Sequence, residues 1–511
     1  DRLPALLGDQ VIFLLVVPSC TEDFEEINTN PTSPAQVPGD FLFSESQWVM
    51  RQNAPNYSYW VWNILHLGNW MQHFGNQNAG FSMAHYLDRG QDSPNYWRAN
   101  YQILSDMQRA QEEIAAQDEG DVARVKSALV EILTVELWYY FTQMLGDIPY
   151  YEALQGVDNV QPAYTPQDEI LQDLISRLDA AISSLSPSDI PAMGPADAWY
   201  RGNVEQWIKY GNSLKLKIGL GIMNGDMGLA QQTVTEAMQG PLLSSTDDNA
   251  ISPVNTAETF YPHPMWSLDR NAISDRPFMG ENFIDLLIAL DDPRLPIIAS
   301  PTVRSVNSGG PLEYRGIVAA PDDAAYAEIN ANLDNYSTAN ADWFSGATSN
   351  YDKGLSRLTY AEVSFEKAEA ALRGWGGSEA DAQTFFEEGI RAAMTVRPYN
   401  DAGITEDQIN AYIAKNGTLT GSFEEKLEQI MQQKYIEYFM DHEFDAYLDW
   451  RRTGLPQLQE GLNQGETGGE IPRRFKYGDQ EPVLNEANYN AAVSRLSNGD
   501  TYLSRVWSDS N

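Results

Sequence analysis

Three segments with little helical periodicity combine aromatic rings with amides, imidazoles and a guanidinium group. A neutral sugar offers an apolar ring face and a rim of hydroxyls, so its binding site needs a flat aromatic surface with hydrogen-bonding groups beside it. The first segment holds Trp60, Trp62, His66, Asn69, Trp70, Gln72, His73, Phe74 and Asn76; the second holds Tyr261, His263, Trp266 and Arg270; the third holds Asn335, Tyr336, Trp343, Phe344, Asn350 and Tyr351. These segments are therefore the candidate ligand-binding regions.

Within these segments we predict a set of ligand-contacting residues. They are Trp70, Trp266, Trp343, Trp62, His73, Asn76, Tyr336, Tyr351 and Arg270. The first three are favoured because each has polar or turn-forming neighbours. For any single ring, packing in a helical core is the stronger interpretation, and Trp60, Trp62 and Trp70 could form the core of a helix pair.

Sequence signatures of catalysis are missing, so we predict no enzyme and no catalytic residue. The chain has no Gly-rich phosphate loop, no G-x-S-x-G elbow and no H-E-x-x-H helix, because His442-Glu443 lacks the second histidine. With 5 His and 1 Cys, a zinc site would need most of them together. We predict no cofactor, although carboxylates and carbonyls leave a calcium site open. Two carboxylates suffice for glycoside hydrolysis, so a secreted glycosidase remains an alternative.

The net charge of −39 limits the partners of the chain. Such a surface repels phosphate backbones and anionic headgroups, which argues against nucleic-acid binding. At 42% hydrophobic residues the chain has enough apolar material for a large core.

The N-terminus resembles a lipoprotein signal. The apolar run at residues 11–17 is too short to span a bilayer, and Ser19 precedes the single cysteine, Cys20. We predict a signal peptide over 1–19, lipidation of Cys20 and a tether over 20–40. The alternative is a buried free cysteine after a short strand.

Helical periodicity dominates the rest of the chain. Helices are predicted over 41–50, 96–116, 121–144, 166–185, 203–222, 359–373, 379–394 and 423–452, the last broken once. Ala370, Ala382, Phe386, Gly389 and Pro398 have the spacing of a tetratricopeptide-like hairpin. We therefore predict a mainly α fold, one domain over 41–511, with loop-rich insertions at about 51–95, 240–356 and 453–511.

Seven short motifs follow one another along residues 23–474. They are Asp23-Phe24-Glu25-Glu26-Ile27-Asn28-Thr29-Asn30-Pro31, Gly146-Asp147-Ile148-Pro149-Tyr150, the segment Asn203 to Leu216 with Trp207 and Lys209, Asp291-Asp292-Pro293-Arg294-Leu295, Thr359-Tyr360-Ala361-Glu362-Val363, Asp449-Trp450-Arg451-Arg452-Thr453-Gly454 and Ile471-Pro472-Arg473-Arg474. Together they resemble the SusD/RagB family of nutrient-binding lipoproteins of Bacteroidetes, in its second large subgroup.

The resemblance implies a tetratricopeptide-like scaffold with a loop-rich ligand face. It implies a protein anchored at the outer surface of the outer membrane that captures glycans, or sometimes peptides, for a SusC-like TonB-dependent transporter, without catalysis. We expect the motifs to be structural: Gly146 and Pro149 end a helix, and Glu362 is a buried partner of Arg451 or Arg452. A helical-repeat scaffold that binds a protein or peptide is the remaining alternative.

Overall fold

The computed structural model describes residues 37–50, 60–78, 85–86, 90–253, 277–340, 354–396 and 398–509. Most of them are helical. The long helices are α2 (Gly39–Met50), α4 (Asp92–Gln117), α5 (Gly120–Leu145), α6 (Gln167–Ser183), α7 (Val204–Gly221), α8 (Met227–Gln239), α15 (Tyr360–Leu372), α16 (Glu379–Thr395), α17 (Glu406–Asn416), α18 (Phe423–Glu437) and α19 (Glu443–Thr453). Among the described residues, no helix is both long enough and apolar enough to cross a membrane.

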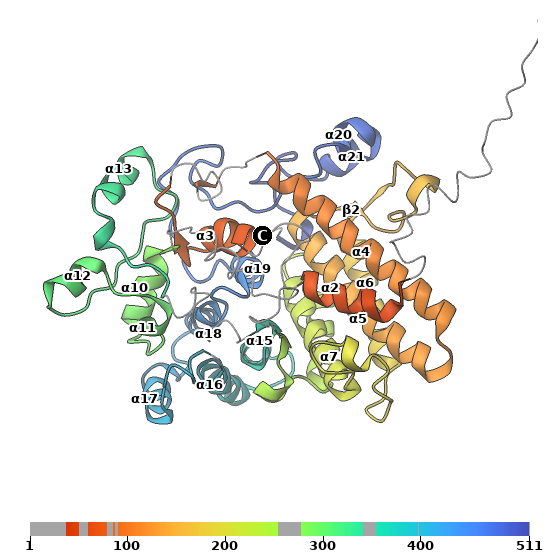
Figure 1. The fold of residues 1–511 in the computed structure, drawn as a ribbon, viewed down its shortest axis with the longest axis horizontal. Coiled ribbons are helices and arrows are strands. Elements are labelled where there is room, and N and C mark those ends of the chain that lie inside the picture. Colours follow the sequence, from red (N-terminus) through yellow and green to blue (C-terminus); the bar gives the residue numbers. More distant parts are fainter. Residues whose placement is uncertain are drawn as a thin grey trace, which may run out of the picture.

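Short elements fill the segments between these helices. They are the π-helix η1 (Trp60–Leu67), the helices α3 (Gly68–Trp70), α10 (Glu281–Ala289), α11 (Leu295–Ile298), α12 (Val303–Ser308), α13 (Asp323–Ala331), α20 (Glu481–Leu484) and α21 (Glu486–Val493), and the 3-10 turns η3 (Gly156–Asp158), η4 (Gly194–Ala196), η5 (Thr246–Asp248), η6 (Leu333–Asn335) and η8 (Trp507–Asp509). Helices α10 to α13 lie to one side of the long helices, and α20 and α21 lie at one end (Figure 1).

The strands form three antiparallel two-stranded pairs. They are β1 (Phe74–Gly75) with β5 (Phe278–Met279), β2 (Ile148–Pro149) with β3 (Tyr164–Thr165), and β4 (Ala250–Ser252) with β6 (Leu355–Leu358). Each pair joins segments that are distant along the chain or closes a turn. The strands therefore fasten the connections, while the helices form the body.

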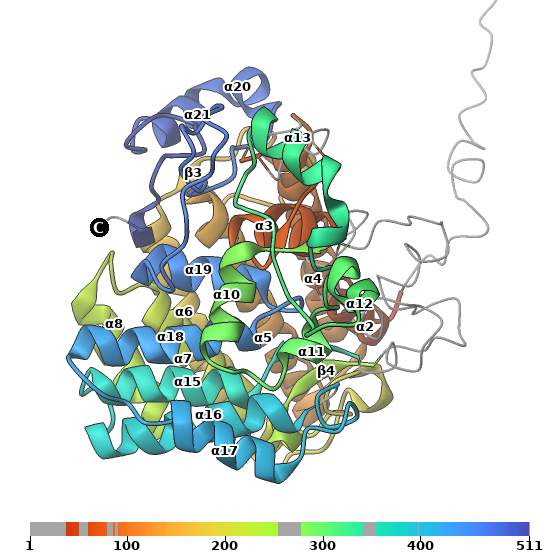
Figure 2. The same ribbon diagram turned by 90° about the vertical axis from the view of Figure 1, so that its left-hand side faces the viewer.

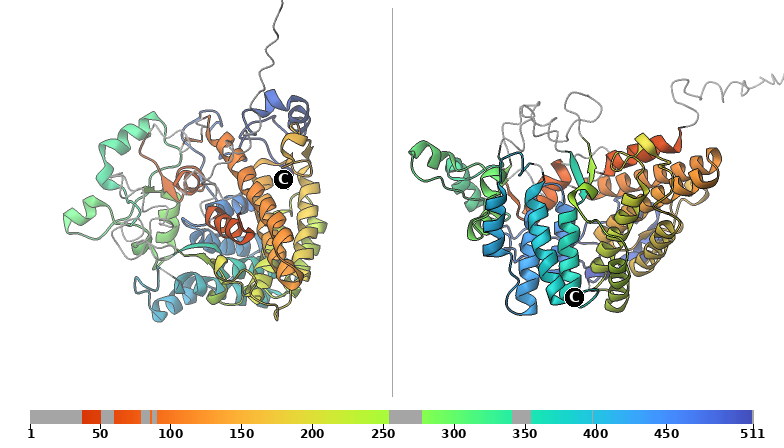
Figure 3. Two further views of the ribbon diagram at one scale, coloured as in Figure 1. Left: turned by 45° about the vertical axis from the view of Figure 1, so that its right-hand side comes forward. Right: turned by 90° about the horizontal axis from the view of Figure 1, so that it is seen from below.

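The tetratricopeptide-like hairpin is confirmed as α15 and α16. Ala370, Ala382 and Phe386 are fully buried. A Cβ on Gly389 would lie 2.5 Å from the Phe365 ring, so only glycine lets the two helices approach this closely. Helix α18 packs on the other side of α15, and the three run side by side (Figure 2; Figure 3, right).

Every predicted helix is present, with shifted ends. Helix α4 starts earlier, at Asp92, and the late helix is broken between α18 and α19, where Met440 has a φ of 79°. The start of helix α6 differs from the prediction. A helix that began at Pro166 would have Thr165 as its N-cap residue, but α6 begins one residue later. Thr165 lies in β3, Pro166 is the extended N-cap residue, and the Gln167 N–H donates to Asp147 Oδ1 over 2.8 Å.

The motif around Gly146 ends α5, as predicted. Gly146 is the C-cap residue with a φ of 83°, a conformation that favours glycine, and its N–H bonds to the Thr142 carbonyl. The Arg474 guanidinium also donates to the Leu145 carbonyl, over 3.2 Å. One motif thus stops α5 and starts α6, and the late I-P-R-R segment fastens the same turn.

Candidate functional site

A cleft opens between the β4–β6 pair and the ends of four helices. Its volume is about 250 Å³. It is lined by Thr246, Asn249, Ile251, Gly354, Ser356, Thr359, Ala393, Val396, Tyr399, Glu437, Phe439, Asp441 and His442. Hydroxyls, an amide, two carboxyls and an imidazole thus share one hollow with two aromatic rings. The set suits a polar ligand of about one ring, since larger drug-like sites start near 300 Å³.

Glu437, the last residue of α18, gives the cleft a carboxyl group of altered acidity. Its Oε1 accepts a hydrogen bond from Thr359 Oγ1 over 2.6 Å, and its Oε2 is buried without a partner in the described part of the chain. Burial raises the pKa of Glu437 to about 6, despite the opposing charge of His442. The group is therefore mainly ionised at neutral pH and becomes a hydrogen-bond donor in mild acid.

His442, just before α19, is held between acceptors. Its Nε2 lies 2.9 Å from Ser356 Oγ, and its Nδ1 lies 3.5 Å from Asp445 Oδ2. Burial opposes the charged form of this ring, but the bond to Asp445 and the charges of Glu437 and Glu362 raise the pKa of His442 to about 9. The ring is thus an imidazolium at neutral pH.

Ser356, His442 and Asp445 have the connectivity of a nucleophile, a base and an orienting acid. Their protonation argues against that role. The Ser356 hydroxyl donates to Asp441 Oδ2 over 3.2 Å, which leaves its lone pair to accept from His442. An imidazolium has no lone pair to take the serine proton, so Ser356 is not activated as a nucleophile. The arrangement orders hydroxyl groups, and this favours binding over acyl transfer.

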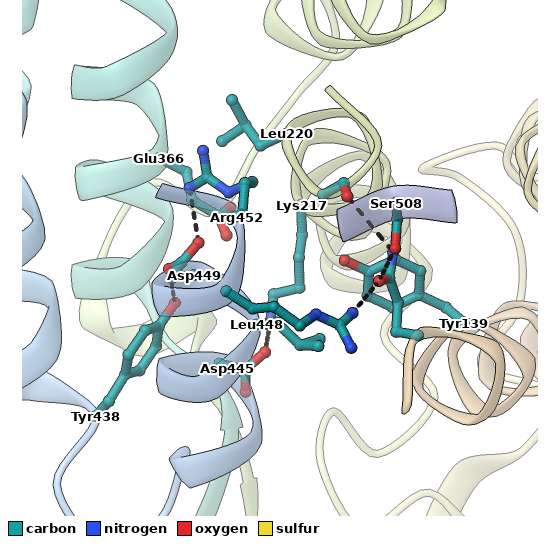
Figure 4. A pocket seen from close by; sticks show the side chains of 13 residues that line it. Tyr139, Lys217, Leu220, Glu366, Tyr438, Asp445, Leu448, Asp449, Arg452 and Ser508 are labelled. Atoms are coloured by element: carbon teal, nitrogen blue, oxygen red, sulfur yellow. Dashed lines mark hydrogen bonds and ion pairs between the residues drawn. The ribbon is translucent and has the colours of Figure 1, made fainter. Parts of the chain in front are cut away.

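A network of buried charges lies behind the cleft. Lys217 of α7 reaches Glu362 of α15 over 2.7 Å and Asp445 of α19 over 2.9 Å. Arg452 of α19 reaches Glu369 over 2.5 and 2.8 Å. Figure 4 shows part of this network around a cavity of about 20 Å³, which is too small for a nutrient.

This network revises the predicted partner of Glu362. The carboxylate pairs with Lys217, and Arg452 pairs with Glu369 and Asp449. The Arg451 guanidinium instead donates to the Arg473 carbonyl and to Gln143. The expected burial of Glu362 is confirmed, but its partner depends on how α7 and α19 pack against α15. The motif residues are structural, as expected.

Three predicted ligand residues lie in the core. Trp62 and Trp70 are at most 1% exposed and pack against Phe475 with centroid distances of 5.2 and 5.4 Å. His73 is fully buried, with Nδ1 2.8 Å from Glu443 Oε2 and its ring stacked on Tyr435. Their burial is the core packing stated as the stronger interpretation, and it argues against direct contact with a ligand.

The remaining predicted residues divide into two groups. Asn76 and Tyr336 are buried at 7% exposure. The side-chain Oδ1 of Asn76 accepts a hydrogen bond from the Asn78 N–H, and the Arg315 guanidinium lies over the Tyr336 ring. Trp266, Arg270, Trp343, Tyr351 and Cys20 lie outside the described residues. The structure brings none of the described predicted residues into the cleft.

The cleft residues were missed because their signal is weak in the sequence. Glu437 and His442 flank the break in the late helix, at positions where a core-facing helix should be apolar. Ionisable residues on such a face indicate a buried polar network or a site.

The described part of the chain contains no cluster of three or more His, Cys, Asp or Glu side chains that could hold a metal.

The charge on His442 predicts a pH-dependent stability. Its pKa is raised in the folded state, so its contribution is complete below about pH 6.5 and is lost as the pH rises through about 9. Between those limits the wild type should lose on the order of 3 kcal/mol of unfolding free energy more than His442→Gln. Urea unfolding across this range measures the difference; parallel curves for the two proteins contradict the prediction.

Comparison with known proteins gives one family match. The second SusD-like family model, described as starch-binding associating with outer membrane, matches residues 31–478. No curated protein matches the sequence at a significant level.

Solved structures match over almost the whole chain. A chitin-binding protein is 25% identical, with a TM-score of 0.76 over 93% of this chain and 99% of its own. A SusD homolog from Bacteroides fragilis is 24% identical, with a TM-score of 0.78 over 92% of this chain and 100% of its own. A chitin-binding SusD homolog from Flavobacterium johnsoniae is 22% identical, with a TM-score of 0.73 over 93% and 98% of the two chains.

Proposed function

Because this chain belongs to the SusD-like family, whose members are described as starch-binding and associated with the outer membrane, we propose that it captures glycans at the cell surface and delivers them to a SusC-like TonB-dependent transporter. The observation that carries the proposal is the family match over residues 31–478. The likeness in fold extends to nearly the full length of SusD homologues. In this role Cys20 carries the lipid anchor, and the mature chain is exposed on the outer membrane.

The proposed ligand is a neutral oligo- or polysaccharide. One similar structure is a chitin-binding protein, and the family is described by starch, so both glucose-type and N-acetylated polymers are candidates. We assign the cleft beside β4 and β6 to one sugar unit. The side-chain NH₂ group of Asn249 can donate to it, and the Ser356 and Thr359 hydroxyls each keep one lone pair that can accept from it. The side chains of Trp266 and Trp343 remain the proposed stacking surfaces. A peptide ligand is the main alternative within the same family role.

Native gel electrophoresis through polysaccharides tests the glycan proposal. The protein without residues 1–19, and with Cys20 replaced by Ser, is run through gels with soluble starch, glycol chitin or no additive. Retardation in one additive without released sugar supports glycan capture and identifies the class of ligand. Released sugar points to the glycosidase alternative, and Glu437→Gln, which removes the carboxyl of raised pKa, should then abolish the release. Retardation in neither gel contradicts the glycan ligand and directs the search to peptides.

The aromatic residues proposed for stacking give a sharper test. We expect each of the variants Trp266→Ala and Trp343→Ala to bind the polysaccharide with roughly tenfold lower affinity, measured from retardation at a series of polysaccharide concentrations. The reason is that an aromatic platform contributes about 1 kcal/mol or more to a sugar contact. The matched control is Phe41→Ala, which removes an exposed ring on α2 at 68% exposure. Equal retardation of all four proteins contradicts the assignment of these two residues.

A further inference from the structure

A second hollow lies between α4, α5, α6 and the segment that follows β2. Its volume is about 350 Å³. Its lining includes the rings of Trp138, Tyr150 and Tyr151 and the charged side chains of Glu131, Asp173 and Arg177. None of these residues lines the cleft beside β4 and β6. The proposed function therefore leaves this hollow without a role.

Successive ring contacts from Trp138 through Tyr150 position the ring of Tyr151 at the rim of the hollow. Leu104, Met107 and Trp138 are buried and form the apolar floor. The Tyr150 ring lies edge-on to Trp138 at 4.9 Å, and Tyr151 lies 4.9 Å from Tyr150. The side chain of Tyr151 is nevertheless 57% exposed. A positioned ring that leaves most of its surface in water is a stacking platform for an apolar ring face.

A row of polar groups lies beside the Tyr151 ring. It consists of the Arg177 guanidinium, the Glu131 and Asp173 carboxylates and the Tyr150 hydroxyl, and is called the polar wall below. Arg177 Nε donates to Glu131 Oε1 over 2.6 Å, and Arg177 Nη1 donates to the Tyr150 hydroxyl over 2.5 Å. That hydroxyl in turn donates to Asp173 Oδ2 over 2.5 Å. Each group is fixed by its neighbour before any ligand arrives, which lowers the entropic cost of binding.

The polar wall keeps unused hydrogen-bonding capacity. Within the described part of the chain, Arg177 Nη2, Asp173 Oδ1 and Glu131 Oε2 make no hydrogen bond. The Gln111 amide donates to the Ser127 carbonyl, so its own oxygen remains an acceptor on the α4 side. Donors and acceptors in a fixed plane match neighbouring hydroxyls, which need both at short spacing.

The charge of the polar wall selects the ligand class. Two carboxylates and one guanidinium leave a net negative charge, which disfavours phosphates, sulfates and acidic sugars. A purely apolar ligand would cover the charged groups without hydrogen-bonding to them, which is costly. A neutral polyhydroxylated ring satisfies both the platform and the polar wall. We propose that this hollow is a second glycan-binding site, which holds a sugar unit with one face on Tyr151.

This inference rests on the proposed function, since it takes the same class of ligand at a separate place. A polysaccharide that binds both sites of one protein molecule at once gains avidity when its length matches the distance between the sites, even if neither site binds more tightly. The second site would therefore favour long polymers over short fragments at the cell surface.

Hydrogen exchange with maltohexaose and with chitohexaose as probes tests the second site. With millimolar sugar, the segment around 148–154 should exchange more slowly in the wild type. The protection should be lost in Tyr151→Ala, which removes an exposed ring, and retained in Tyr151→Phe, which keeps the stacking face. Phe41→Ala should behave as the wild type. Titration with sugar should show an affinity at this site at least about tenfold lower in Tyr151→Ala, so that millimolar sugar no longer protects the segment.

The possible outcomes separate the two proposals. Protection outside this segment but not at 148–154 overturns the second site and leaves glycan capture standing. Protection at 148–154 that survives in Tyr151→Ala also overturns it, because the platform is then not used. Protection at 148–154 alone supports the second site and argues against the cleft and the loop aromatics. No protection anywhere with either sugar refutes the second site and glycan capture together.

Discussion

Replacing Asp197 by alanine is expected to lower the free energy of unfolding by at least about 4 kcal/mol. Asp197 is fully buried. Its two oxygens accept hydrogen bonds from five donors: Gln47 Nε2, the N–H groups of Trp199, Tyr200 and Gly202, and Trp207 Nε1. Alanine leaves them all without their acceptor in the core, and each buried unsatisfied donor costs roughly 1–3 kcal/mol.

The position of Asp197 explains why the loss is not local. Gln47 belongs to α2 and Trp207 to α7, so one carboxylate joins two helices that are distant in sequence. The Trp207 ring is stacked on Trp199 at 5.6 Å, and losing its hydrogen bond loosens this stack. The substitution is therefore expected to weaken the packing of α2 against the rest of the helical body as well.

Urea unfolding of wild type, Asp197→Ala and Asp197→Asn measures the effect. The asparagine keeps one acceptor oxygen but turns an NH₂ group toward the other donors, so an intermediate loss of about 2–3 kcal/mol is expected. Asp334→Ala, at an exposed carboxylate, is the control and should change stability by no more than about 0.5 kcal/mol. An Asp197→Ala protein as stable as the control would show that the five bonds contribute nothing.

Replacing Arg452 by methionine is expected to cost about 3 kcal/mol, the low end of the range for breaking a buried ion pair. The loss is not larger because Arg373 still reaches Glu369 over 2.8 Å and Lys434 still reaches Asp449 over 2.8 Å. Arg452 forms a two-pronged pair with Glu369 over 2.5 and 2.8 Å and also reaches Asp449 over 2.7 Å. Both Arg452 and Glu369 are shielded from solvent. Methionine fills much of the volume, so the loss reports the charge rather than a cavity.

Two further variants identify the cause. Lys415→Met breaks an ion pair with Asp291 in which both side chains are about half exposed or more, and it should cost no more than about 1 kcal/mol. The double variant Arg452→Met/Glu369→Met removes cation and anion together and should be less destabilised than the sum of the single variants. If the destabilisation of the double variant equals the sum of those of the two single variants, the two groups do not interact.

The same pair predicts sensitivity to acid. Burial favours the neutral form of Glu369, yet the Arg452 and Arg373 guanidinium groups hold the pKa of Glu369 well below its usual range. A depressed pKa stabilises the fold above the unfolded value of about 4.3, and the contribution disappears as the pH falls. Acid unfolding of Arg452→Met should therefore begin at a higher pH than that of the wild type.

The sequence by itself determined the helical body and the family. Helix patterns depend on neighbours three and four residues apart, so α4, α5, α7 and the α15–α16 hairpin could be predicted from residue spacing. The break between α18 and α19 and the helix stop at Gly146 also came from local residue types. The short helices α10 to α13 were not predicted, because their few turns are stabilised by packing rather than by propensity.

Only the tertiary structure decided which rings are buried and which charges pair. Trp70 and Tyr151 are both aromatic residues with polar neighbours, yet one is in the core and the other is exposed at the rim of a hollow. Glu362 could have paired with any cation that reached it, and the crossing of α7 over α15 gave it Lys217. Burial and pairing depend on the packing of segments hundreds of residues apart, which short-range spacing does not encode.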